Sequence, residues 1–288
     1  MHDVKLSSAT KVLFPADGIT KAELAEHYAV VGEAMVRQIR DRPVSLQVYP
    51  GGIGRPGHFM KSIPDYFPDW VDRVEVPKRG GTVVHPLANE PAALQQFAQH
   101  NAITPHVWTS RADRPDRPDR LVVDLDPDEH DTWADVVAGA HIARELLEGA
   151  GLTAFTMTTG SRGAHVVAPL RRESDFEAVR SLAGLLGDRI VEAAPDRFTT
   201  EFHKDKREGR LYIDVLRNRP AQTVVAPYAL RAIDGAPMAT PLRWDELEGT
   251  GPRDHSIRDA AARVADDPWA DLQAAAASPR SAARSLGG

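Results

Sequence analysis

The stretch Leu121–Pro127, which reads Leu-Val-Val-Asp-Leu-Asp-Pro, decides the fold that we expect from this chain. Its apolar, partly β-branched run predicts the end of a buried strand. Because side chains alternate across a strand, Asp124 and Asp126 share one face and Leu125 lies on the other. Pro127 has no backbone N–H and ends the pairing. The sequence therefore predicts a strand that brings two carboxylates to one place.

Two interpretations of this carboxylate pair are open. Neighbouring carboxylates repel each other unless a cation lies between them, and their oxygens suit Mg²⁺, Mn²⁺ or Ca²⁺. The pair could equally be two solvated aspartates at a turn, where Asp is common. The spacing alone does not choose between a metal site and a turn.

The composition limits the class of protein without fixing its function. The chain has 288 residues, of which 42% are hydrophobic and 26% charged, as in an ordinary globular protein that can bury a substantial core. We find no apolar run of membrane-spanning length and no export signal, so we expect no membrane partner and a cytoplasmic location. The absence of cysteine excludes disulfides, thiolate nucleophiles and cysteine zinc sites. The net charge of −6 argues against a sequence-independent nucleic-acid coat, although local basic patches can still bind phosphate.

Strand and helix patterns are mixed along the chain, which predicts an α/β or α+β domain. A capping box at residues 20–23 predicts one long helix that continues to Ile39. The tract Arg111–Arg120 repeats Asp-Arg-Pro, which predicts an exposed loop. We expect a single domain over residues 1–270 and a disordered tail over residues 271–288, where Ala, Ser and Arg dominate the last dozen positions.

Two later segments carry further polar groups. A tight turn, Gly160-Ser161-Arg162-Gly163, joins two predicted strands and is followed by His165, which favours antiparallel pairing there. The predicted strand Leu211–Val215 places Asp214 among apolar neighbours. A third aspartate on a strand points either to the same site or to a structural acid near an arginine.

In this order and spacing, the motifs resemble those of the archaeo-eukaryotic primase superfamily, and most closely the polymerase domain of bacterial ligase D. The matching segments are Lys11-Val12-Leu13-Phe14-Pro15, Thr20-Lys21-Ala22-Glu23, Phe59…Lys61…Ile63-Pro64, His106 before Trp108, Asp124-Leu125-Asp126-Pro127, Thr159-Gly160-Ser161-Arg162-Gly163-Ala164-His165, Ile213-Asp214-Val215-Leu216-Arg217-Asn218, Ala226-Pro227-Tyr228, Gly235-Ala236-Pro237, Thr240-Pro241-Leu242 and Trp244-Asp245-Glu246-Leu247. Any one of these matches is weak, but together they are specific and cover nearly the whole chain.

The resemblance implies a primase-polymerase fold, with an RRM-like mixed or antiparallel catalytic sheet flanked by helices and an N-terminal αβ unit. It implies a template-dependent nucleotidyltransferase that adds nucleotides, with ribonucleotides preferred, to primer 3′ ends at gaps or breaks during non-homologous end joining. No segment resembles a ligase or phosphoesterase domain, so we expect a stand-alone polymerase module that acts with a separate ATP-dependent DNA ligase and with Ku, associated with the nucleoid.

The resemblance also implies roles for particular residues. Asp124, Asp126 and Asp214 would hold two ions, Mn²⁺ or Mg²⁺, which in two-metal sites lie about 4 Å apart. A nucleoside triphosphate would bind a larger group: His106, Thr159, Ser161, Arg162, Gly163, His165, Arg217 and Arg231. The Thr159–Gly163 turn lacks the Walker spacing. A lone histidine in a strand, such as His106, is otherwise more typical of a packed core.

DNA would contact a second group of residues. Lys11 and Lys21 match residues that bind a downstream 5′-phosphate, and the helix N-terminus at Thr20 suits an anion. Phe59 matches an aromatic residue that stacks on a template base. Lys61 and Arg207 lie in matching basic segments that we assign to DNA. The expected partner is therefore gapped or broken duplex DNA with a 5′-phosphate, together with NTP or dNTP.

Three residues depart from the family pattern. His58 stands where a second aromatic residue is frequent, Arg162 where lysine is frequent, and Ile233 where a second arginine is usual. The loss of the arginine at position 233 keeps open a second hypothesis, a catalytically weak module that binds the 5′-phosphate of DNA ends. A metal-dependent phosphoesterase is the third, since such enzymes also use clustered aspartates.

Overall fold

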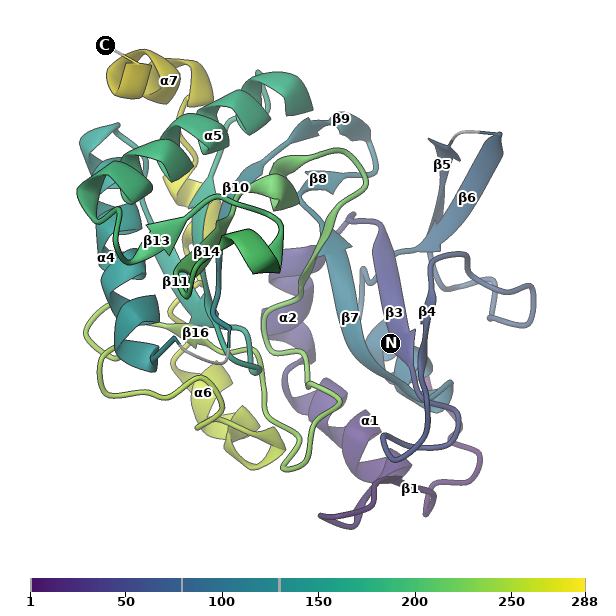
Figure 1. Cartoon of the computed structure of the whole chain (residues 1–288). Coiled ribbons are helices and arrows are strands. Elements are labelled where there is room, and N and C mark those ends of the chain that lie inside the picture. Colours follow the sequence, from purple (N-terminus) through teal and green to yellow (C-terminus); the bar gives the residue numbers. More distant parts are fainter. Residues whose placement is uncertain (1, 79, 129–130, 288) are drawn as a thin grey trace. The chain divides into compact units, whose positions relative to one another are not determined.

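The computed structural model describes residues 2–78, 80–128 and 131–287. These residues form two compact units, each built from several stretches of chain (Figure 1). The first unit contains residues 2–115, 223–240 and 255–270, and the second contains residues 116–222, 241–254 and 271–287. The chain therefore returns twice to the first unit, and the single domain expected over residues 1–270 stays a prediction.

The first unit contains a sheet of strand order β15-β7-β3-β4 with antiparallel pairing. Its strands are β1 (Val12–Phe14), β2 (Ile19–Thr20), β3 (Val44–Val48), β4 (His58–Met60), β5 (Arg73–Lys78), β6 (Gly81–Pro86), β7 (Ala102–Trp108), β8 (Ser110–Arg111) and β15 (Thr223–Val225). Its helices are α1 (Lys21–Val30), α2 (Gly32–Ile39), α3 (Pro91–Gln99), η3 (Ile257–Asp259) and α6 (Ala260–Ala265). The pairing of β15 with β7 explains why residues 223–240 belong to this unit.

The long helix predicted from Thr20 to Ile39 is two helices. The capping box is present, since the Thr20 side chain accepts from the Glu23 N–H and Glu23 binds back to Thr20. The first helix nevertheless ends at Val30, and α2 begins at Gly32 after the capping residue Val31. A Cβ atom on Gly32 would lie 2.6 Å from the Cβ of Pro91 at the start of α3. This close approach is a tertiary contact that the local periodicity does not report.

The second unit is built on a sheet of strand order β13-β14-β10-β12-β11-β16, in which β13 and β14 are parallel and the other pairs antiparallel. Its strands are β10 (Arg120–Asp126), β11 (Phe155–Thr158), β12 (Ala164–Pro169), β13 (Phe198–Thr199), β14 (Leu211–Asp214) and β16 (Pro241–Leu242), and β9 (Arg114–Pro118) crosses the boundary between the units. Its helices are α4 (Trp133–Gly149), α5 (Phe176–Ala193), η1 (Lys204–Lys206), η2 (Leu216–Asn218), η4 (Leu272–Ala275) and α7 (Pro279–Gly287).

Helices α4 and α5 cover one face of this sheet, and the hydrophobic core lies between the helices and the sheet (Figure 1). Leu121, Val123 and Leu125 of β10 are fully buried in that core. The alternation therefore turns Asp124 and Asp126 to the face away from these helices. The predicted strand and its two-faced pattern are confirmed.

The predicted loop at Arg111–Arg120 is wrong. Residues 110–111 and 114–118 form β8 and β9, which pair as a two-stranded sheet. Proline is compatible with extended backbone at a sheet edge, where its missing N–H breaks no ladder. The Asp-Arg-Pro repeat therefore makes an edge hairpin.

The expected disordered tail also differs from the structure. Residues 272–275 and 279–287 are helical, and Leu272 and Ala282 are fully buried. Leu170 forms a parallel bridge with Ala277. The alanines that suggested low complexity therefore pack against the second unit.

Removing the N-cap of α5 should destabilise the protein without touching any candidate site residue. The Asp175 carboxylate accepts a hydrogen bond from the Ala178 N–H at 3.0 Å. Asp175→Ala should lower the free energy of unfolding by about 1 kcal/mol, as measured by urea denaturation. Asp175→Asn retains an acceptor and should stay close to wild type, so an equal loss in both variants would contradict the cap as the cause.

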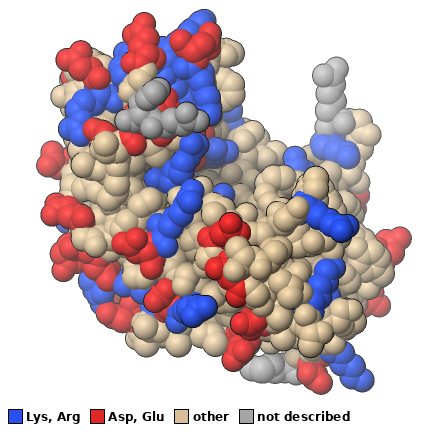
Figure 2. All heavy atoms as spheres, turned by 60° about the horizontal axis from the view of Figure 1, so that its bottom comes forward, with Lys and Arg blue, Asp and Glu red and all other residues tan. Residues whose placement is uncertain are grey.

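Basic and acidic side chains are interspersed on the face drawn in Figure 2, in keeping with the net charge of −6. Phosphate binding therefore has to come from local groups of cations. Over the residues that the structure describes, every helix is too short or too polar to cross a membrane.

Candidate active site

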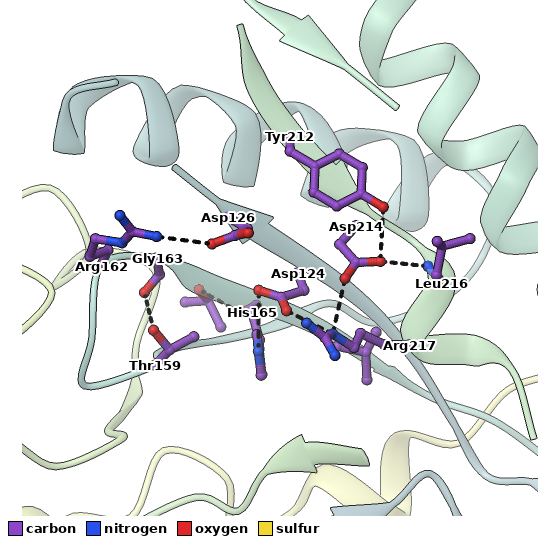
Figure 3. Close-up of polar contacts among 12 residues, drawn as sticks. Asp124, Asp126, Thr159, Arg162, Gly163, His165, Tyr212, Asp214, Leu216 and Arg217 are labelled. Atoms are coloured by element: carbon purple, nitrogen blue, oxygen red, sulfur yellow. Dashed lines mark hydrogen bonds and ion pairs between the residues drawn. The ribbon is translucent and has the colours of Figure 1, made fainter. Parts of the chain in front are cut away.

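Strand pairing brings the three aspartates together in the second unit (Figure 3). Asp124 lies directly across from Asp214 on β14 and from His165 on β12. Asp126 is two residues farther along β10 and lies opposite Tyr212. Because β10 is paired on both sides, its neighbours hold the two aspartates in a fixed register.

Arg217 lies between two of these carboxylates. Its Nε is 3.1 Å from Asp124 Oδ2 and 3.0 Å from Asp214 Oδ2. His165 Nε2 is 3.4 Å from the other oxygen of Asp124. Burial alone would raise the pKa of the Asp124 carboxyl, but His165 and Arg217 together lower it. Burial lowers the pKa of Arg217, and the charges of Asp124 and Asp214 outweigh this and raise it.

The surroundings of Asp126 and Asp214 favour the ionised carboxylate less than those of Asp124 do. Burial and the neighbouring Asp124 charge raise the pKa of Asp126, and the nearest basic side chain, Arg162, is 4.0 Å away. Burial is also the main cause of the raised pKa of Asp214. Asp214 accepts a hydrogen bond from the Leu216 N–H at 2.8 Å. The charges of Arg162, Arg207 and Arg217 therefore offset only part of the effect of burial and of Asp124 on the pKa of Asp126.

This donor set fits a divalent cation. Carboxylate oxygens are the preferred ligands of Mg²⁺ and Mn²⁺. A cation would stabilise the ionised forms of Asp126 and Asp214, whose pKa values are raised by burial and, to a smaller extent, by the Asp124 charge. Across the described part of the chain, no three His, Asp or Glu side chains are grouped closely enough to form a ligand shell as they stand. Arg217 takes the position between Asp124 and Asp214.

The Gly160–Gly163 turn packs directly against the end of β10. The Thr159 N–H and Oγ1 both donate to the Gly163 carbonyl, at 2.9 and 3.0 Å, which closes the turn. Gly160 has a φ of +65°, which favours glycine. A Cβ atom on Gly163 would lie 2.0 Å from the Leu125 carbonyl oxygen, so only glycine fits there. The turn is therefore held close against the end of β10, the strand that carries Asp126.

Other candidate nucleotide and template residues belong to the first unit. Phe59 on β4 is 52% exposed, and its ring contacts His106 on β7 edge-to-face at 5.3 Å. Arg231 follows β15, and its N–H binds the Pro237 carbonyl at 2.8 Å. The family's second arginine position, Ile233, lies in the same turn, where its N–H binds the Arg231 carbonyl.

The two lysines predicted to bind a 5′-phosphate are neighbours. The pairing of β1 with β2 brings the Lys21 N–H within 2.8 Å of the Lys11 carbonyl. Lys21 is only 4% exposed, and its ammonium donates to the carbonyls of Ser7 and Gln99. Burial and then the Lys11 charge lower the pKa of Lys21. Lys11 donates to the Pro50 carbonyl.

The basic residues Lys61 and Arg207 have opposite surroundings. Lys61 is exposed beyond the end of β4. Arg207 is 4% exposed, donates to the carbonyls of Glu201 and Phe202, and lies 4.0 Å from the centre of the Tyr212 ring. Arg207 therefore stabilises the loop that contains Glu201 and Phe202, a structural role that the sequence did not predict.

Two further residues at the site were also missed. The Tyr212 hydroxyl donates to Asp214 Oδ1 at 3.4 Å. The Asn218 amide accepts from the Val122 N–H at 2.9 Å and donates to the Val122 carbonyl at 2.7 Å, so a side chain continues the ladder on β10. Their sequence signal was their position near Asp214: Asn218 ends the matching motif that begins at Ile213, and Tyr212 directly precedes it.

Comparison with known proteins identifies the family. The family model of the LigD primase-polymerase domain matches residues 20–269. The chain belongs to this family. Its sequence is 34% identical over 272 residues to the multifunctional non-homologous end joining protein LigD of Mycobacterium bovis, covering 92% of this chain and 36% of that protein. It is 31% identical to LigD of Pseudomonas aeruginosa, covering 93% of this chain and 32% of that protein.

A solved structure in the LigD family has the same fold. The polymerase domain of Mycobacterium tuberculosis ligase D, solved in complex with DNA, matches with a TM-score of 0.88 and 32% identity, over 95% of this chain and 99% of that one. The predicted mixed α/β fold with antiparallel sheets is thereby confirmed. The chain spans about a third of the length of the curated LigD proteins that it matches.

The raised pKa of Asp126 leads to a pH-dependent stability effect. Because the folded state binds this proton more tightly than the unfolded state, ionised Asp126 destabilises the fold above its raised pKa, and the penalty disappears as the pH falls through that pKa. Asp126→Asn should therefore raise the free energy of unfolding at pH 7, with a smaller gain at pH 4, as measured by urea denaturation. The exposed Asp188→Asn serves as control. A gain of equal size at both pH values would contradict this origin.

Proposed function

We propose that this chain is a template-dependent nucleotidyltransferase that adds nucleotides, with ribonucleotides preferred, to primer 3′ ends at gaps or breaks during non-homologous end joining. The observation that carries the proposal is the register of β10, which sets Asp124 opposite Asp214 with Asp126 on the same face. Membership of the LigD primase-polymerase family supports the same reaction.

Asp124, Asp126 and Asp214 would hold two divalent cations, Mn²⁺ or Mg²⁺. Bound there, the cations would activate the attacking 3′-hydroxyl and stabilise the pyrophosphate that leaves. The protein's own contribution is to hold three carboxylates on paired strands, with Arg217 and His165 limiting their repulsion. Tyr212 and the Leu216 N–H fix the orientation of Asp214.

The triphosphate would bind at the turn beside these carboxylates. The Ser161 hydroxyl, the Gly163 N–H and the Arg162 cation suit phosphate oxygens. Thr159, whose own donors close the turn, would hold these groups in place. The contact of the turn with β10 supports this role, because it keeps the phosphate donors next to the metal ligands. We also assign four residues outside the turn to nucleotide binding: His165 and Arg217 of the second unit, and His106 and Arg231 of the first unit.

DNA would be recognised mainly by the first unit. The exposed Phe59 ring is suited to stacking on a template base, an interaction worth about 1–3 kcal/mol. Lys11 and Lys21 would bind the downstream 5′-phosphate, and Lys61 and Arg207 the DNA backbone. The proposed partners in this role are an ATP-dependent DNA ligase and Ku.

Primer extension on a one-nucleotide gap with a downstream 5′-phosphate tests this function. In Mn²⁺, the protein should extend the primer with the templated nucleotide, and ribonucleotides should react faster than deoxyribonucleotides. Asp126→Ala run beside it should be inactive. If the wild-type protein binds the gap and does not extend the primer, the end-binding module replaces the polymerase. Release of nucleotides from DNA without any triphosphate would instead indicate a phosphoesterase.

The position of Lys21 leads to a binding prediction. Lys21→Ala should weaken binding to gapped DNA that carries the 5′-phosphate by about tenfold, because a charge-assisted contact is lost. Binding to the same gap without the phosphate should change little. Fluorescence anisotropy measures both affinities, and thermal unfolding controls for the lost contacts with Ser7 and Gln99. An equal loss on both DNAs would remove Lys21 from phosphate recognition.

A further inference from the structure

Arg253 holds the middle of the Gly160–Gly163 turn from outside. Its Nε donates to the Ser161 carbonyl oxygen at 2.6 Å, across 92 positions in the sequence. Both residues belong to the second unit, and both line one hollow of about 320 Å³ together with Arg162. The motif comparison gave Arg253 no role.

The segment that carries Arg253 is firmly attached to the second unit. Strand β16 pairs with β11, the strand that leads into the turn. The Trp244 indole N–H donates to the Ala154 carbonyl at 2.9 Å, and Leu247 is fully buried. Just before Arg253, the Gly251 N–H binds the Asp254 carboxylate at 2.7 Å. Arg253 therefore reaches the turn from a well-supported loop.

The contact has a consequence for phosphate binding. The peptide bond after Ser161 is trans, so its carbonyl and the Arg162 N–H point in opposite directions. By holding the carbonyl, Arg253 directs the Arg162 N–H to the other side. It also withdraws a carbonyl oxygen, whose partial negative charge would repel a phosphate, from that side. The other end of the turn is fixed by the contact of Gly163 with β10.

We propose that Arg253 is a positioning residue that sets the peptide plane between Ser161 and Arg162, so that the Arg162 N–H is directed toward the triphosphate. This inference rests on the proposed nucleotidyltransferase function and adds a residue to it. Arg253 does not need to touch the nucleotide, so its loss should affect triphosphate binding more than the chemical step.

The test compares Arg253→Gln and Arg253→Lys with Arg180→Gln, which removes an equal charge from an exposed position on α5. Primer extension on gapped DNA should give a KM for the triphosphate about fivefold higher in Arg253→Gln, with a smaller change in kcat. Arg253→Lys should recover part of this loss, and Arg180→Gln should match wild type. Hydrogen exchange of a peptide covering residues 159–164 should be faster in Arg253→Gln, with an unchanged Tm.

Several outcomes would overturn the inference. An unchanged KM in Arg253→Gln, unchanged exchange in the turn, or an equal KM increase in Arg180→Gln would each remove the positioning role. If Arg253→Gln does not fold, the intermediate KM and exchange expected of Arg253→Lys decide the question. A wild-type protein that neither binds triphosphate nor extends primers would refute the proposed function, and the exchange experiment would still test the support of the turn.

Discussion

Asp124→Asn should reduce primer extension by about 10³-fold or more, because it removes the carboxylate at the centre of the site. Asp124 is the residue that faces both Asp214 and His165 across paired strands, and it also binds Arg217. Asn retains the shape of the side chain and can hold one cation ligand, but it carries no charge. The loss should therefore fall on the rate of extension under saturating DNA and nucleotide, measured in a single-turnover assay with Mn²⁺.

The matched control is Asp188→Asn, an exposed acid on α5 that makes the same change of charge. It should extend primers at the wild-type rate. Binding of Asp124→Asn to gapped DNA, measured by anisotropy, should stay within a few-fold of wild type because the proposed DNA contacts other than Arg207 lie on the first unit. Extension by pure Asp124→Asn near the wild-type rate would exclude a central role for this carboxylate. A parallel loss of DNA binding would indicate damage beyond the catalytic step.

The local sequence was sufficient to predict β10 and the face of its aspartates. In the three apolar residues followed by Asp-Leu-Asp-Pro, side chains alternate between the two faces of the strand, and the proline ends the strand pairing. Leu125 is buried in the core as expected. Asp214 is different, because no local pattern states which strand lies beside β10. Only the resemblance to a known family linked it to Asp124, and the pairing of β10 with β14 supplies the physical reason.

The structural features that the sequence did not predict share a tertiary cause. The start of α2 at Gly32 coincides with the close approach of Pro91, a residue far along the chain. Loop geometry places the Arg207 guanidinium over the Tyr212 ring, which no local pattern indicates, and the assignment of Arg207 to DNA stays a prediction. Asn218 completes the ladder of β10 only because η2 folds back onto Val122. In each case the contact is made by a residue that lies outside the local sequence pattern.

Gly163→Ala should be the most damaging single-methyl change near the site. The added Cβ would lie 2.0 Å from the Leu125 carbonyl oxygen, far inside contact distance, and both atoms belong to backbone that cannot rotate away. The turn must therefore move off β10, which breaks the close packing at the strand end and shifts the proposed phosphate donors relative to Asp126. We expect a loss of about 2–3 kcal/mol in the free energy of unfolding, together with loss of most extension activity.

Gly184→Ala provides the opposite control for Gly163→Ala. Gly184 lies inside α5 with nothing within 4 Å of the position of a Cβ, so alanine should stabilise the protein by about 0.5–1 kcal/mol through its helix propensity. Urea denaturation and triphosphate affinity should be measured for both variants. If Gly163→Ala kept wild-type stability and affinity, the tight contact between the turn and β10 would not exist in solution. If it lost stability but kept triphosphate affinity, the turn would be a structural element only, because displaced donors cannot bind the same phosphates equally well.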